Sequence, residues 1–130
     1  MTDKEIVSNF FIEGYVNKHY DFIMEYVSES YIDHSPAGAR SNKDAVSILK
    51  IVAEMFDKLN IEIMDIFAEN GMVATRVRYD AIHTGICMGI SPTGKHISFE
   101  GLEHFKVENG KIVESWGYWP DKEIEQMLLS

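Results

Sequence analysis

Glu103 is the side chain whose setting most clearly points to chemistry, because it stands on the apolar face of a predicted strand. Its neighbours on that face are Gly101 and Phe105. Burial of an unpaired carboxylate is costly and raises its pKa, so Glu103 either has a partner or lines a cavity. His83 is in register with the apolar face of the preceding strand and is a candidate partner. Such a pair either fixes sheet geometry or places a proton-transfer group in an apolar pocket.

A second polar cluster, at 33–36, reads Asp-His-Ser-Pro and lies where the predicted extended segment 31–34 passes into a turn. Turn chemistry alone accounts for Asp33 and Ser35. His34, in contrast, is a candidate acid–base group at the mouth of a pocket, since histidine titrates near neutral pH.

Three aromatic residues, Trp116, Tyr118 and Trp119, fall within four positions near the end of the last predicted strand. Aromatic side chains provide large contact areas. The cluster therefore serves either the core or a wall against which a ligand stacks.

Three other patterns lack a feature that their chemistry requires. The segment 89–95 reads G-x-x-x-x-G-K, but His96 follows where a phosphate loop needs Ser or Thr and a helix. His96, Glu100 and His104 share one strand face but spread over about 26 Å at 3.3 Å per residue, too far for one metal. Cys87 has no basic neighbour to lower its pKa. We predict no cofactor, no metal and no cysteine nucleophile.

Length and charge narrow the class of protein. The 130 residues suit a single domain over 1–130, and 21 acidic against 12 basic residues give a net charge of −9. Scattered Lys and Arg argue against nucleic acid as a partner, and the acidity argues against an anionic membrane surface. No stretch is long and apolar enough to span a bilayer, and the acidic N-terminus is unlike a secretory signal. We expect a cytoplasmic protein.

The hydrophobic pattern changes once along the chain, from helical spacing to alternation. Thr2 and Glu5 form a capping-box pattern, and Ser41 or Asn42 caps a later helix whose apolar stripe continues to Leu59. Two Asn-Gly pairs predict hairpin turns. The predicted helices cover 2–15, 21–27, 42–59 and 121–129, and the predicted strands cover 61–67, 72–84, 95–107 and 112–119. This order predicts an α+β fold with helices on one face of a twisted antiparallel sheet.

Several of these segments together resemble the SnoaL-like polyketide cyclase (ester cyclase) family. They are 31–36, 83–85, 89–95 and 109–116, within a resemblance that extends from about Phe10 to Leu129. The resemblance implies the NTF2-like fold, in which helices close a cone of strongly curved sheet around an apolar pocket. It also implies a homodimer through the outer sheet face, where Arg76, Arg78, His96, Glu100 and His104 are expected.

In this family the resemblance implies a cofactor-free intramolecular aldol closure, with one aspartate as general acid and base. That aspartate usually stands four residues after the tryptophan of the last strand. Here Pro120 occupies that place and Asp121 follows it, while Ser115 replaces the usual histidine before Trp116. A one-residue shift on a strand turns a side chain to the opposite face, so Asp121 reaches the pocket only if the strand has ended.

We therefore predict acid–base proton transfer, of cyclase or isomerase type, on a small hydrophobic carbonyl compound. The candidate catalytic residues are Asp121, Glu103, His34 and His83, and the candidate substrate-binding residues are Tyr15, Phe99, Trp116 and Tyr118. Two alternatives stay open, because a fold does not fix a function. One is a non-catalytic ligand-binding or scaffold protein, and the other is an epoxide hydrolase or isomerase that positions a water molecule.

Overall fold

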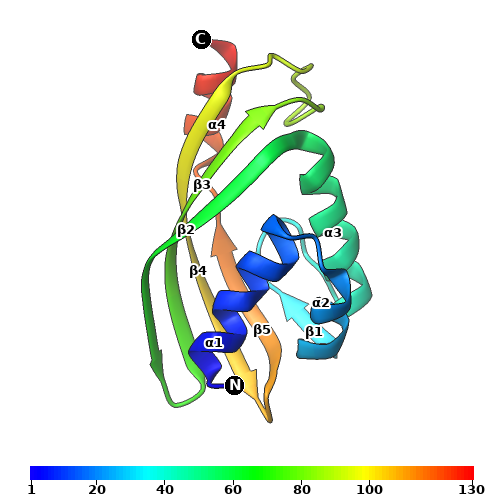
Figure 1. Cartoon of the computed structure of the whole chain (residues 1–130), viewed down its shortest axis with the longest axis vertical. Coiled ribbons are helices and arrows are strands. Elements are labelled where there is room, and N and C mark those ends of the chain that lie inside the picture. The colour runs from blue at the N-terminus through cyan, green and yellow to red at the C-terminus, as the bar shows by residue number, and fades with distance from the viewer.

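A computed structural model describes residues 1–130 and shows helices packed against one face of a curved, open five-stranded sheet (Figure 1). The strands lie in the order β1-β5-β4-β3-β2. Their bounds are β1 Val27–Asp33, β2 Phe56–Glu69, β3 Met72–His83, β4 His96–Glu108 and β5 Lys111–Tyr118. The helices are α1 Asp3–Asn9, a π-helical turn η1 Phe10–Val16, α2 Tyr20–Tyr26, α3 Asn42–Met55 and α4 Asp121–Leu129. The predicted α+β fold is confirmed.

Local signals in the sequence account for several boundaries. Thr2 and Glu5 form the predicted capping box at α1, and the Ser41 side chain accepts a hydrogen bond from the backbone N–H of Asp44 at the start of α3. Asn70 and Asn109 have φ near +51°, and each is followed by a glycine at positive φ. Both Asn-Gly pairs thus make the tight turns that join β2 to β3 and β4 to β5.

Two structural predictions are wrong, one about the sheet and one about the end of a helix. The sheet is mixed rather than antiparallel, because β1 pairs with β5 in parallel. Also, α3 ends at Met55, and Phe56 begins β2 opposite His83 instead of continuing the helix. Phe56 and Leu59 keep helical spacing with α3, so the apolar pattern did not show where the helix ends.

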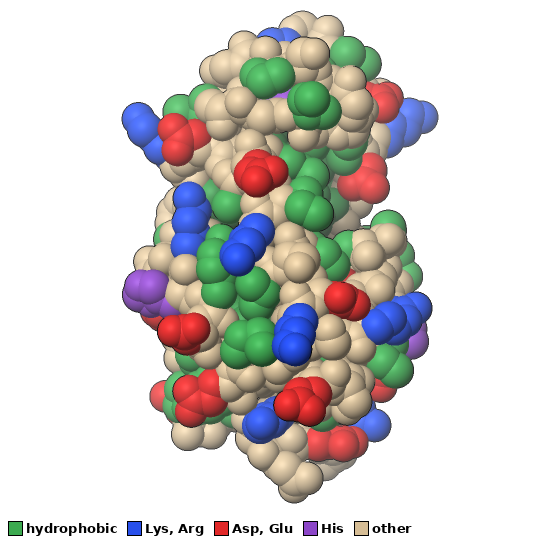
Figure 2. Space-filling model, turned by 90° about the vertical axis from the view of Figure 1, so that its right-hand side faces the viewer, with side chains coloured by type: hydrophobic (Ala, Val, Ile, Leu, Met, Phe, Trp, Pro, Cys, Tyr) green, Lys and Arg blue, Asp and Glu red, His purple; other side chains and the backbone are tan.

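Charged side chains on the outer sheet face pair within the chain. Arg76 contacts Asp65 at 2.6 Å and Glu100 at 3.1 Å, and Arg78 contacts Glu62 at 3.5 Å. On the face that carries α3, basic and acidic side chains are interspersed (Figure 2).

None of the helices has the length and apolar character needed to cross a membrane.

Candidate active site

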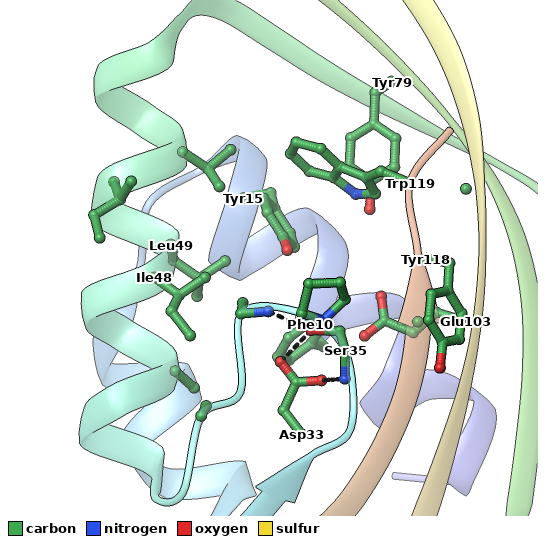
Figure 3. Close-up of a pocket in the computed structure, with 18 of the residues that line it drawn as sticks. Phe10, Tyr15, Asp33, Ser35, Ile48, Leu49, Tyr79, Glu103, Tyr118 and Trp119 are labelled. Atoms are coloured by element: carbon green, nitrogen blue, oxygen red, sulfur yellow. Dashed lines mark hydrogen bonds between the residues drawn. The ribbon is translucent and has the colours of Figure 1, made fainter. Parts of the chain in front are cut away.

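A cavity of about 360 Å³ lies between α3 and the concave face of the sheet (Figure 3). Ile48 and Leu49 of α3 form part of one wall, and residues of β3, β4 and β5 form the other. Hydrophobic residues make up 15 of the 22 that line it. The volume is in the range of small-molecule sites, and the apolar lining strengthens electrostatic effects inside.

Glu103 projects into this cavity from the middle of β4 (Figure 3). Its backbone carbonyl accepts a hydrogen bond from the Thr75 hydroxyl at 2.8 Å, but its carboxyl group makes no hydrogen bond within the chain. Burial, with a smaller contribution from the nearby Asp33 carboxylate, raises the pKa of Glu103 to about 8. The group is therefore mostly protonated at neutral pH and becomes a stronger base than an ordinary glutamate when it ionises.

The space for Glu103 comes from Gly117, its register partner on β5. A Cβ atom at position 117 would lie 2.7 Å from both Cγ and Cδ of Glu103. Glycine at 117 is thus required by the close approach of the glutamate side chain rather than by backbone conformation.

Substituting Gly117→Ala should destabilise the protein by about 1–3 kcal/mol, because the new methyl group displaces the Glu103 side chain. In a Glu103→Ala background the same substitution should cost close to nothing, since the clashing atoms are gone. Urea denaturation of the four proteins in this double-mutant cycle measures the coupling. Equal costs in both backgrounds would show that Gly117 does not make room for Glu103.

Asp33, at the end of β1, is the second carboxyl group of the cavity and is held by three donors. The backbone N–H and the hydroxyl of Ser35 donate to it at 2.8 and 2.7 Å, and the Ser115 hydroxyl lies 3.4 Å from Oδ1. Ser115 also pairs with the Tyr31 hydroxyl at 2.5 Å. This chain of polar groups fixes Asp33 on the floor of the cavity beside Glu103.

Aromatic rings form a continuous wall above the two carboxyl groups. The ring centroid of Tyr79 lies 5.9 Å from that of Tyr15 and 5.3 Å from that of Trp119. The Tyr15 hydroxyl makes no hydrogen bond within the chain, and burial raises its pKa well above the ordinary tyrosine value. It therefore stays a hydroxyl donor, directed into the cavity (Figure 3).

Asp121 lies at the rim of the cavity, in the first turn of α4. Strand β5 ends at Tyr118, so the one-residue displacement from the family's position does not turn Asp121 to the opposite face. Its side chain is exposed, in contrast to that of Glu103. Tyr15 and Tyr118 also line the cavity, and Tyr118 does so from its exposed edge.

The prediction that His83 partners Glu103 is wrong. Glu103 pairs with Thr75 in the β3–β4 register, eight residues along β3 from His83 (83 − 75), or roughly 26 Å at 3.3 Å per residue. His83 is buried, and its Nδ1 lies 2.9 Å from the hydroxyl of Thr93. This hydrogen bond connects the loop before β4 to the end of β3, and His83 does not line the cavity.

Three other predicted residues also lie outside the cavity lining. His34 and Trp116 stack on each other with centroids 5.1 Å apart, and His34 Nε2 lies 2.5 Å from a carboxylate oxygen of Glu114. Phe99 stacks on Tyr79 at 4.9 Å and supports the aromatic wall from behind.

The lining residues that were not among the predicted site residues include four that shape the site: Tyr31, Asp33, Tyr79 and Trp119. The signal that could have found two of them is alternation, because Tyr31 and Asp33 share the buried face of β1, whereas His34 follows the strand's end. Trp119 lies just past β5 and closes the cavity, while Trp116 faces the other side.

Comparisons of the sequence and of the structure with known proteins point to the same family. The family model for the SnoaL-like polyketide cyclase matches residues 5–128. A proposed SnoaL-like polyketide cyclase from Jannaschia sp. CCS1 superposes with a TM-score of 0.89 at 16% identity, covering 97% of this chain and 90% of that one. IdmH, a proposed polyketide cyclase from Streptomyces antibioticus, gives 0.88 at 18% identity with full coverage of both chains. AclR, a proposed hydroxylase from Streptomyces galilaeus, gives 0.83 at 25% identity, covering 97% and 94%.

No curated protein sequence matches the chain significantly. The structural neighbours share the curved sheet and its helices, as expected for the NTF2-like fold. The family model covers nearly the whole chain, from the capping turn of α1 to the end of α4. The protein belongs to the SnoaL-like polyketide cyclase family.

Proposed function

We propose that this protein removes a proton from the carbon next to a carbonyl group in a small hydrophobic, polyketide-like compound and so catalyses an aldol-type ring closure. The observation that supports this most strongly is the Glu103 carboxyl group, which faces an apolar cavity without a partner in the chain. A carboxyl group in such a place has the proton affinity that carbon acids require.

Glu103 is the acid–base residue of this proposal, and Tyr15 is the hydrogen-bond donor. The ionised Glu103 takes the α-proton, and the electron pair moves to the carbonyl oxygen, which becomes an enolate. The Tyr15 hydroxyl, kept protonated by burial, donates a hydrogen bond to that oxygen. The apolar ring surfaces of Tyr79 and Trp119 strengthen this interaction.

Ring closure then returns the proton. The enolate carbon attacks a second carbonyl carbon of the same molecule and forms the new C–C bond, while the second carbonyl oxygen becomes an alkoxide. Glu103, now a carboxylic acid, gives its proton to the alkoxide and is ionised again. Atoms and electrons balance within the substrate and one glutamate. Asp33 acts through Glu103, because its charge helps to keep the proton affinity of Glu103 high.

The alternatives have less support. A scaffold protein would be expected to fill its cone with side chains, whereas a cavity of about 360 Å³ is reached by Glu103 and Asp121. Epoxide hydrolysis needs polar groups free to position water. Here the cluster of Tyr31, Ser115, Asp33 and Ser35 uses most of its capacity on hydrogen bonds among its own members, with one position on Asp33 left for a ligand.

Exchange of the α-protons of 2-tetralone, a bicyclic ketone, tests the first step without the natural substrate. In D₂O followed by proton NMR, the protein should accelerate exchange beyond the buffer rate. Because the base is the ionised form of a group with a pKa of about 8, the catalysed rate should rise about tenfold per pH unit below pH 7 and level off above pH 9. A catalysed rate that is absent, or that falls as pH rises, would contradict the proposal.

A further inference from the structure

The charges around the cavity are unbalanced in a way that carbonyl chemistry does not require. Three carboxyl groups line it, from Asp33, Glu103 and Asp121, and no Lys, Arg or His does. Six aromatic side chains line it as well: Phe10, Tyr15, Tyr31, Tyr79, Tyr118 and Trp119. Aromatic faces and carboxylates together attract organic cations.

We propose that the cavity binds hydrophobic primary amines in their ammonium form, with the nitrogen between Glu103 and Asp33 and the apolar skeleton against the aromatic wall. Both carboxyl groups point into the same space (Figure 3). This binding is a further property of the site and does not depend on the protein being a catalyst.

The hydrogen-bonding capacity of the two carboxyl groups fits three ammonium N–H donors. A carboxylate offers about four lone-pair positions. Asp33 uses three of them, on the Ser35 backbone N–H, the Ser35 hydroxyl and the Ser115 hydroxyl. One position on Asp33 is left for a ligand, and the Glu103 carboxyl has all of its positions free.

A bound ammonium group also supplies the positive charge that the cavity lacks. In the free protein, burial and the nearby Asp33 carboxylate keep Glu103 largely protonated at pH 7. A cation between the two groups favours the ionised form of Glu103, so binding releases its proton. The Tyr15, Tyr79 and Trp119 rings, packed edge to face, present an apolar surface to the rest of the ligand.

The cavity size sets the class of amine. A cavity of about 150 Å³ holds one benzene ring, so a cavity of about 360 Å³ accommodates a bicyclic skeleton. We therefore choose 2-aminotetralin as the cationic probe and 2-tetralol as its neutral counterpart of the same shape.

Isothermal titration calorimetry at pH 7 tests this pair of probes. The amine should bind about 10- to 100-fold more tightly than the alcohol, the range expected for charge-assisted hydrogen bonds. Titration in buffers of different ionisation enthalpy should show release of about one proton per amine bound, and none for the alcohol. Equal affinities, or no binding of the amine, would overturn the proposal.

Two variants assign the effect to Glu103. In Glu103→Gln, the proton release should disappear and the preference for the amine should fall about tenfold, while 2-tetralol binding reports that the cavity is intact. Glu69→Gln makes the same change at an exposed residue of β2 outside the cavity and should behave like the unmodified protein. Proton release that persists in Glu103→Gln would also overturn the proposal. If the amine does not bind but the protein still accelerates 2-tetralone exchange, this proposal fails and the proposed catalysis stands. If the amine binds but exchange is not accelerated, the proposed catalysis fails and amine binding stands.

Discussion

Glutamine in place of Glu103 should slow α-proton exchange of 2-tetralone by about 10²–10⁴-fold, the usual contribution of a positioned acid–base group. The amide keeps the shape of the side chain in the gap left by Gly117 but cannot accept the proton. The remaining rate comes from the Tyr15 hydroxyl and from binding alone. Substrate affinity should change much less than the rate, so the loss should appear in kcat rather than in KM.

Two further substitutions make this result specific. Glu69→Gln, at an exposed position outside the cavity, should leave the exchange rate unchanged. Asp121→Asn tests the carboxylate that stands one residue beyond the family's aspartate position, at the rim of the same cavity. A large loss in Asp121→Asn with little loss in Glu103→Gln would move the acid–base role to Asp121. No loss in either variant would exclude both from the reaction.

Much of the architecture could be predicted because it depends on local patterns. Alternation identified β3, β4 and β5 almost in full and the middle of β2, and it also singled out Glu103 as a carboxyl group on an apolar face. The Asn-Gly turns and the caps of α1 and α3 fixed the boundaries between elements. These signals act within a few residues of each other, so a single sequence is enough to read them.

The rest of the site depends on contacts between distant segments. Pairing of β1 with β5 in parallel brings Tyr31 and Asp33 to Ser115, more than 80 residues away in the chain. Nothing local specifies that pairing, and the register of β1 against β5 shifts between Val27 and Ile32, so the alternation of β1 alone does not identify its partners. His34 was therefore predicted to be the functional residue of its cluster. In the structure its ring stacks on Trp116, outside the cavity lining.

Glu103 also makes the stability of the fold depend on pH, whether or not the protein is a catalyst. Its pKa is about 8 in the folded protein and about 4.5 when the chain is unfolded. Between these values the folded state keeps a proton that the unfolded state has lost, so unfolding releases a proton. Stability from this group is therefore fully present below pH 4.5, falls as pH rises, and is lost above pH 8.

The free energy of unfolding of Glu103→Gln, compared with that of the unmodified protein, should show this dependence directly. Each unit of pKa shift corresponds to about 1.4 kcal/mol, so the difference between the two proteins should grow by about 2–4 kcal/mol from pH 5 to pH 8.5, with the glutamine variant gaining. Groups that titrate identically in both proteins cancel in this comparison. Urea denaturation at pH 5, 6.5, 8 and 9 measures the difference, and Glu69→Gln, whose carboxyl is exposed, should run parallel to the unmodified protein. If the unfolding free energy of Glu103→Gln also ran parallel to that of the unmodified protein, Glu103 would titrate like an ordinary surface glutamate. The proposed base and the proposed proton release on amine binding would then both lose their physical cause.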